Sequence, residues 1–184
     1  TYHSSTAKAY KALATQSVRA SVSPRKALFV CPPGATTPLS TIAYINAAYE
    51  LAQDVQNGLL PAAPDRIYVP AGSGGTFIGL LIGTKAIPIF NNTKIIPVTS
   101  GSKRPTEQYL KHARDVLQYL KTLTNGTFPT IDITKRELSA MLDREFHGEA
   151  YAAITEAGIE AKKLAKLDGL DLEHTYTAKT MARL

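Results

Sequence analysis

Apolar residues recur along this chain mainly at spacings of three and four, the period of a helix with one buried face. After Pro38, for example, Leu39, Ile42, Ile45 and Tyr49 fall on one face. Proline fits the first position of a helix, because the N–H that it lacks would have no partner there. The spacing predicts helices over residues 5–21, 38–49, 77–84, 105–120 and 155–167.

Shorter apolar runs, bounded by glycine and proline, lie between these segments and are typical of buried strands. They predict strands over residues 27–31, 66–69 and 94–98, with a further short strand over 130–134. Pro97 is unusual in a central strand, because proline has no N–H to donate to a neighbouring strand. Strands that alternate with helices favour a three-layer α/β fold, in which helices cover both faces of a parallel sheet.

The composition narrows the class of protein without identifying it. The 184 residues are 44% hydrophobic and 20% charged, which suits a globular domain with a core, and no apolar run is long enough for a membrane span. The single cysteine, Cys31, excludes an internal disulfide framework and fits a reducing compartment, so we expect a cytoplasmic protein with no membrane partner. The four histidines are scattered, and no ligand spacing predicts a metal site.

The net charge of +6, from 21 basic and 15 acidic residues, is spread thinly along the chain. There is no basic run and no alternation of basic with aromatic residues, so we do not expect nucleic acid as a partner. A positive field also suits a small anionic cofactor or substrate. The charge therefore directs attention to sites for small anions.

The segment from Gly72 to Thr76 reads Gly-Ser-Gly-Gly-Thr and lies between a predicted strand and a predicted helix. Glycines let a backbone approach a ligand closely, and the start of a helix offers free N–H groups to an anion. Ser73 and Thr76 add hydroxyl donors, so the loop predicts a phosphate site. It differs from the Walker loop, which ends in Gly-Lys-Ser/Thr, and from the Gly-x-Gly-x-x-Gly dinucleotide fingerprint. A glycine-rich turn without a ligand is the alternative.

Three stretches of the chain, in this order and at these spacings, carry a family resemblance. They are Cys31-Pro-Pro-Gly-Ala-Thr-Thr-Pro-Leu39, the loop Ala71-Gly-Ser-Gly-Gly-Thr76, and His174-Thr-Tyr-Thr-Ala-Lys-Thr-Met181. Together they resemble the D-cysteine desulfhydrase and 1-aminocyclopropane-1-carboxylate deaminase family, within the tryptophan synthase β-like, fold type II, pyridoxal-phosphate enzymes. The resemblance spans nearly all of the chain, and its Tyr-Thr-x-Lys-x-Met ending is the most specific element.

The resemblance implies pyridoxal 5'-phosphate as the cofactor, with its phosphate held by Gly72, Ser73, Gly74, Gly75 and Thr76. It places Thr177 near the pyridine nitrogen, and it makes Tyr176 and Tyr151 catalytic candidates for substrate contact or proton transfer. Relatives that act on aminocyclopropane carboxylate carry a glutamate where this chain has Thr177, which leans the expected chemistry toward desulfhydrase-like elimination. A packed aromatic side chain is the alternative for Tyr151. Lys179 is interpreted as a helix-start or surface lysine.

The implied function is that of a lyase or deaminase that releases ammonia and a 2-keto acid from a small amino acid. The chain would be the C-terminal portion of such an enzyme, with residues 1–30 ending the small domain and residues 31–184 forming the large, cofactor-binding domain. The family's Schiff-base lysine lies upstream in an Asn-Lys-x-Arg-Lys-type stretch, which these residues do not contain. We therefore expect an N-terminal half, on this or another chain, as a partner, and a homodimer as the family implies.

Two other functions stay open at this point. A non-catalytic structural or interaction protein would keep the fold without the lysine, and a separate module would bind a phosphate ligand alone. Because the lysine is the group that forms the covalent link to the cofactor, the chain is not expected to catalyse the reaction by itself. Whether it is an enzyme is therefore left open by the sequence.

Overall fold

The computed structural model describes residue 11 and residues 31–100 and 104–184. The chain forms two compact units, residues 1–33 and 34–184, and a short 3-10 turn, η1 (Pro33–Ala35), lies at their boundary. The predicted helix over 5–21 falls outside the described residues except for Lys11, which is helical. The predicted strand over 27–31 falls outside them except for Cys31, which is in no strand. The remaining elements belong to the second unit.

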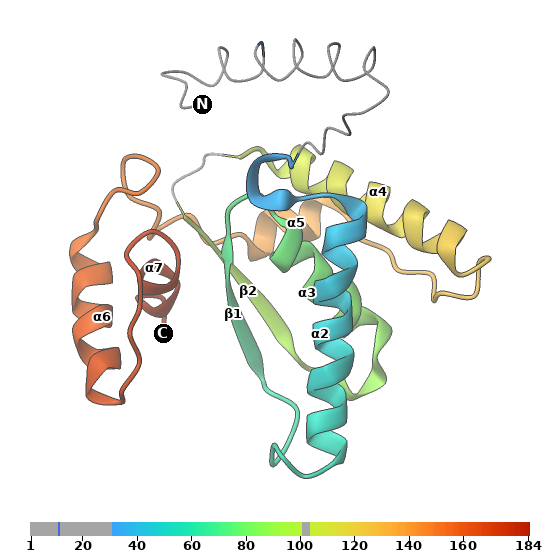
Figure 1. Cartoon of the computed structure of the whole chain (residues 1–184), viewed down its shortest axis with the longest axis horizontal. Coiled ribbons are helices and arrows are strands. Elements are labelled where there is room, and N and C mark those ends of the chain that lie inside the picture. The colour runs from blue at the N-terminus through green and yellow to red at the C-terminus, as the bar shows by residue number, and fades with distance from the viewer. Residues whose placement is uncertain (1–10, 12–30, 101–103) are drawn as a thin grey trace, which may run out of the picture. The chain divides into compact units, whose positions relative to one another are not determined.

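Two parallel strands, β1 (Arg66–Ala71) and β2 (Lys94–Thr99), form the sheet of the described residues. Their register pairs the two strands from their first residues to their last. Figure 1 shows the strands between helix α7 (Thr177–Met181) on one side and helix α3 (Gly75–Ala86) on the other, and both helices contact both strands. The predicted α/β fold, with helices on both faces of a parallel sheet, is confirmed.

Pro97 lies inside β2, as predicted, and its surroundings explain why a proline is tolerated there. Its carbonyl accepts a hydrogen bond from the N–H of Asp143 at 2.9 Å, and the N–H of Thr99 donates to the carbonyl of Asp143 at 2.8 Å. The N and C=O of one strand residue face the same side, so the nitrogen of Pro97 faces away from β1. The missing donor therefore costs no bond between the two strands.

Helix α2 (Pro38–Gln56) begins as predicted, with Thr37 as its N-cap and Pro38 in its first turn. The Thr37 hydroxyl accepts from the Ser40 N–H at 3.1 Å, and the Ser40 hydroxyl accepts from the Thr37 N–H at 2.9 Å. This reciprocal pair satisfies two donors that a helix start leaves free. The helix is thereby fixed close to the glycine loop.

The buried face of α2 agrees with the predicted one only in part: Ile45 is buried and Ile42 packs against the core, as predicted. Leu39 and Tyr49 are exposed, and the buried stripe consists of Thr41, Ile45, Ala48 and Ala52. These are mostly small side chains, because α3 lies unusually close to this stripe. The prediction chose the larger apolar residues, whereas close helix packing selects the smaller ones.

Two glycines of α3 explain this close approach, as the small residues of the segment predicted. A Cβ atom on Gly79 would lie 2.6 Å from the Cβ of Tyr44, and one on Gly83 would lie 2.6 Å from the Cβ of Ala48. Both distances are shorter than side chains tolerate, so the two helices pack backbone against side chain. The position of α3, and with it of the glycine loop, is therefore fixed by α2.

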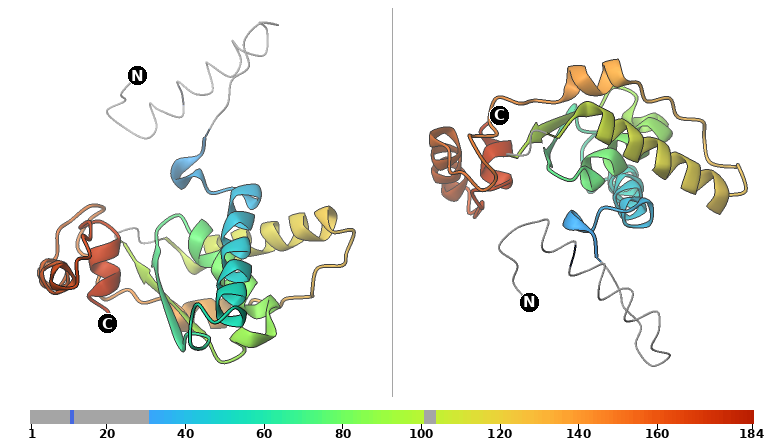
Figure 2. Two further views of the ribbon diagram at one scale, coloured as in Figure 1. Left: turned by 60° about the horizontal axis from the view of Figure 1, so that its bottom comes forward. Right: turned by 90° about the horizontal axis from the view of Figure 1, so that it is seen from above.

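The other helices complete the unit. They are α4 (Thr106–Leu123), α5 (Lys135–Met141), α6 (Glu156–Leu167) and a 3-10 turn, η2 (Pro88–Phe90). The apolar face predicted for α4 is buried in the core, and in Figure 2 α6 lies beyond α7 as seen from the sheet. Within the described part of the chain, no helix has both the length and the apolar character needed to cross a membrane.

The strand predicted over residues 130–134 is wrong. Ile133 is buried and Ile131 is half-buried against the core, but these residues form no strand. Thr134 is instead the N-cap of α5, where its hydroxyl accepts from the N–H of Glu137 at 3.1 Å. The segment is therefore an extended connection, anchored in the core by two isoleucines, that leads into α5.

Candidate functional site

The glycine loop leaves β1 and enters α3 directly. Gly74 has a φ of +102°, in the left-handed region that favours glycine, and it is the N-cap of α3. The first hydrogen bond into the helix runs from the Ile78 N–H to the Gly74 carbonyl at 2.9 Å. The preceding N–H groups, of residues 75–77, therefore have no carbonyl partner within the helix. With the positive end of the helix dipole, they form a site for an anion.

Tyr109 of α4 supports this loop through hydrogen bonds to its backbone carbonyls. Its hydroxyl lies 2.9 Å from the Gly72 carbonyl and 3.2 Å from the Ala71 carbonyl, to which it donates. Its ring packs edge-to-face on Phe77, with centroids 5.8 Å apart. A Cβ atom on Gly74 would lie 2.7 Å from this ring. Sequence reasoning missed Tyr109, although a tyrosine on the buried face of an amphipathic helix needs a partner for its hydroxyl.

The segment that follows the Pro-Pro pair lies against the same loop. Gly34 has a φ of +69°, and a Cβ atom there would overlap the hydroxyl of Ser73. The Thr36 hydroxyl donates to the Ser73 hydroxyl at 2.5 Å. Two of the three stretches that carried the family resemblance are therefore adjacent in the fold. Because Ser73 accepts from Thr36, its own proton is left for another acceptor.

Beside the loop is a buried hydroxyl without a partner. A Cβ atom on Gly72 would lie 3.4 Å from Ser100 Oγ and 3.4 Å from Cε1 of Tyr176, so the three residues adjoin. Ser100 is 1% exposed, and its hydroxyl makes no hydrogen bond with any residue that the structure describes. Buried polar groups nearly always have a partner, so such an atom marks a place where a polar ligand group would be satisfied. Nothing in the sequence pattern singled out Ser100.

The two predicted tyrosines meet each other. The hydroxyls of Tyr151 and Tyr176 lie 2.7 Å apart, and their rings contact edge-to-face with centroids 6.1 Å apart. The hydrogen bond to Tyr151, followed by partial burial, raises the pKa of Tyr176 to about 12. Tyr151 is 63% exposed, so it is not the packed aromatic side chain of the alternative interpretation. Through Tyr176, the pair adjoins Gly72 of the loop.

Thr177 lies at the start of α7, with its hydroxyl turned toward the preceding segment. That hydroxyl accepts from the Glu173 N–H at 2.9 Å and donates to the Glu173 carbonyl at 3.2 Å. Burial would raise the pKa of Glu173, but backbone N–H groups of residues 175–177, each 2.6 Å from its carboxylate, outweigh this and hold the pKa below its usual value. The role of Thr177 at a pyridine nitrogen stays a prediction.

Lys179 lies in the first turn of α7, as the helix-start interpretation predicted, but it is not a surface lysine. It is 0% exposed, and its ammonium donates to the His147 carbonyl at 2.8 Å. Burial lowers the pKa of Lys179 below its usual value, and the charge of Glu173 partly opposes this. The predicted surface position was wrong because the short helix α7 is enclosed between the sheet and α6, so it has little solvent-facing surface.

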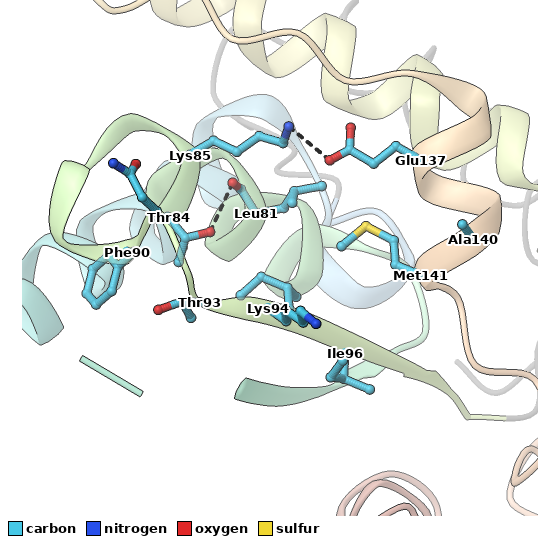
Figure 3. A pocket seen from close by; sticks show the side chains of 12 residues that line it. Leu81, Thr84, Lys85, Phe90, Thr93, Lys94, Ile96, Glu137, Ala140 and Met141 are labelled. Carbon is cyan, nitrogen blue, oxygen red and sulfur yellow. Dashed lines mark hydrogen bonds and ion pairs between the residues drawn. The ribbon is translucent and has the colours of Figure 1, made fainter. Parts of the chain in front are cut away.

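A cavity of about 570 Å³ lies elsewhere, between α3, β2 and α5 (Figure 3). Lys85 and Glu137 form an ion pair of 2.9 Å at its wall, and no residue of the glycine loop lines it. It therefore gives no support to the predicted chemistry. In the part of the chain that the structure describes, no group of histidine, cysteine, aspartate or glutamate side chains is arranged to hold a metal ion.

Comparison with known proteins bears on the family and the fold of this chain. A family model described as "Pyridoxal-phosphate dependent enzyme" matches residues 2–184. A crystal structure described as that of an "ACC deaminase homologue" matches with a TM-score of 0.73 and 22% sequence identity. The match covers 99% of this chain and 51% of that one, so this chain spans about half the length of that protein. At this identity the likeness shows the fold, and the predicted fold type II architecture is confirmed.

Proposed function

This chain belongs to the family of pyridoxal-phosphate dependent enzymes, and from that premise we propose that it supplies the phosphate loop and part of the active site of a lyase or deaminase. The substrate would be a small amino acid. The reaction would be an α,β-elimination like that of D-cysteine desulfhydrase, or a ring opening like that of aminocyclopropane-carboxylate deaminase, and would release ammonia and a 2-keto acid. The observation that carries this proposal is the loop with free N–H groups at the start of α3, adjoining a tyrosine pair.

The residues present fit the phosphate of this cofactor. Glycines stand at positions 34, 72 and 74, where a Cβ atom would meet Ser73, Ser100 or Tyr109. The free N–H groups of the first turn of α3 and the hydroxyls of Ser73 and Thr76 would hold the phosphate. The unpartnered hydroxyl of Ser100 is a further polar atom that a ligand would satisfy. When bound, the cofactor supplies an electron sink for bonds broken at the amino-acid α-carbon.

The tyrosine pair would handle protons at this site. A phenol with a pKa near 12 keeps its proton at neutral pH, so Tyr176 would donate a hydrogen bond or a proton. Tyr151, whose hydroxyl lies 2.7 Å away, would orient that proton and exchange it with solvent, since Tyr151 is exposed. Proton transfer between such hydroxyls needs no movement of the backbone.

Thr177 supports the elimination over the ring opening. A neutral hydroxyl near the pyridine nitrogen would accept or donate a hydrogen bond without holding a full charge there. Relatives that open the aminocyclopropane ring carry a glutamate at this position, as the family resemblance implies. We therefore place desulfhydrase-like chemistry first and deaminase-like chemistry second.

Three further parts of the proposal concern a segment outside these residues, the oligomeric state and the cellular location. Because it spans about half the length of the structure that it resembles, we assign the lysine that binds the cofactor to a segment outside these residues. We also propose a homodimer, as in the family, and a cytoplasmic location, which the single cysteine supports. An alternative is a non-catalytic relative that retains the fold, and the missing Asn-Lys-x-Arg-Lys-type stretch favours it.

The decisive experiment uses the protein together with its upstream segment. Cofactor absorbance that persists after dialysis, with ammonia and a 2-keto acid formed from D-cysteine or from aminocyclopropane carboxylate, is the expected result. Retained absorbance without either product would support the non-catalytic alternative. Binding of inorganic phosphate without any retained absorbance would contradict both and indicate a phosphate-binding module.

A further inference from the structure

Helix α7 contacts the segment of residues 147–151 at two points about one helical turn apart. The Tyr176 hydroxyl meets the Tyr151 hydroxyl at 2.7 Å, and the Lys179 ammonium donates to the His147 carbonyl at 2.8 Å. The two partners lie four residues apart in one loop. We call the loop 147–151 with these two side chains the tyrosine arm.

The position of Lys179 is unusual for a lysine. It is 0% exposed, and none of the ion pairs found among the described residues involves it. Glu173 is the acidic residue whose charge it feels, but that carboxylate is occupied by the N–H groups at the start of α7. Burying an ammonium without an acidic partner is costly, and an apolar residue of similar volume would serve packing better. The lysine therefore calls for an explanation other than stability.

The loop side of the contact is equally specific. Gly148 follows His147 with a φ of +76°, and a Cβ atom on it would lie 3.6 Å from the Lys179 ammonium and 3.1 Å from Thr155. The backbone thus bends around the end of the lysine side chain. Tyr151, three residues further on, is mostly exposed, so its hydrogen bond and edge-to-face ring contact with Tyr176 are too weak to hold the loop by themselves.

We propose that Lys179 is a positioning residue, which holds the His147 carbonyl and thereby keeps the hydroxyl of Tyr151 against that of Tyr176. The inference rests on the proposed function only where it assigns proton transfer to Tyr151 and Tyr176. The contact between Lys179 and the His147 carbonyl exists in the chain without cofactor. Its effect on the tyrosine pair is therefore testable even if the proposed function fails.

The test is the ionisation of Tyr176, followed by NMR of ring-labelled tyrosine and assigned with the variants Tyr151→Phe and Tyr176→Phe. In Lys179→Met the loop is released, the tyrosine pair separates, and the pKa of Tyr176 should fall from about 12 toward the usual value of about 10. Removing a positive charge alone would move this pKa upward. The direction of the change therefore separates positioning from direct electrostatics.

Two variants act as controls. Lys85→Met removes another lysine that donates to a backbone carbonyl, that of Asp132 at 3.2 Å, and it should leave Tyr176 unchanged. Lys179→Arg keeps donors at the contact and should retain most of the raised pKa. A folded Lys179→Met whose Tyr176 pKa is unchanged or higher would overturn the proposal.

If Lys179→Met does not fold, Lys179→Gln repeats the test with a polar side chain too short to reach the carbonyl. NMR of the unaltered chain gives a second, variant-free measurement. If Lys179 holds the loop, contacts between the ring protons of Tyr151 and Tyr176 should be observed, because the two rings pack edge-to-face. Absence of these ring contacts in the folded chain would overturn the proposal whichever variants fold.

Discussion

The glycine loop and the tyrosine arm adjoin at Gly72 and Tyr176, but they are built in opposite ways. The loop is held through its own backbone. Its glycines lie in close contacts, its Gly72 carbonyl accepts a hydrogen bond from Tyr109, and the helix that follows it packs on α2. The arm is held by the ends of two long side chains, and Tyr151 is largely exposed. Under the proposed function, the rigid loop would hold the phosphate and the more adjustable arm would move protons.

This contrast predicts that substitutions in the loop affect folding and binding together. Gly74→Ala should have the largest effect, because its Cβ atom would lie 2.7 Å from the Tyr109 ring at a φ of +102°. Positive φ and a forced contact each cost about 1–3 kcal/mol. We expect the free energy of unfolding, measured in urea, to fall by about 2–6 kcal/mol, with loss of phosphate binding.

Gly58→Ala is the matched control for this change. Gly58 also has a positive φ, of +72°, but a Cβ atom there would meet nothing within 4 Å. It should lose only about 1–2 kcal/mol and bind phosphate normally. Equal losses in the two variants would show that Tyr109 does not brace the loop.

The same contrast explains what the sequence could predict. The loop could be located from Gly72 to Thr76 because a strand, a run of glycines and an apolar helix follow one another along the chain. Its neighbours could not be predicted, because Tyr109 and Ser100 are brought to the loop only by the fold. The spacing of residues along the chain indicates local backbone structure, but it does not indicate contacts between residues that are distant in sequence.

The arm shows the limit more sharply. Tyr151 and Tyr176 were named only through the family resemblance, and the burial of Lys179 was missed because a lone lysine is usually a surface residue. The wrong strand at residues 130–134 and the partly wrong face of α2 have different causes. In the first case the apolar residues were recognised, but the local helix cap at Thr134 was overlooked. In the second the deciding contacts are with two glycines of another helix, Gly79 and Gly83 of α3, which no pattern within α2 indicates.

The second prediction concerns the Tyr109 hydroxyl, which donates a hydrogen bond to the glycine loop. Tyr109→Phe leaves the Gly72 carbonyl without its 2.9 Å donor inside the core. Because an unsatisfied buried acceptor costs about 1–3 kcal/mol, we expect a loss of roughly that size in unfolding free energy, with weaker phosphate binding. A variant as stable as the parent would mean that water reaches these carbonyls.

The third prediction concerns pH and the helices that carry the loop. The Thr41 hydroxyl donates to the Thr37 carbonyl at 2.9 Å, so at its 2.9 Å contact with His112 Nε2 it accepts, which requires a proton on that nitrogen. Burial first, and then the charge of Arg104, lower the pKa of His112. The unfolded chain therefore binds a proton more readily than the folded one.

Stability should consequently decline as pH falls below about 6.5, the usual histidine value, until the lower pKa of the folded state is passed. His112→Gln keeps a donor for Thr41 and removes the titrating group. Urea unfolding across this range should show a flatter pH dependence in the variant than in the parent. Identical slopes would assign the effect to other groups.

The smallest effect on stability is expected in the arm. Tyr151→Phe removes one oxygen, as Tyr109→Phe does, but from an exposed hydroxyl whose partner, Tyr176, is only partly buried. The unfolding free energy should change by less than about 0.5 kcal/mol, because water replaces the lost bond. The pKa of Tyr176 should nevertheless fall from about 12, since the hydrogen bond to Tyr151 is the main cause of its shift. If Tyr151→Phe instead destabilised the chain as much as Tyr109→Phe, the arm would be as rigid as the loop, and the division between a fixed binding half and an adjustable reacting half would be wrong.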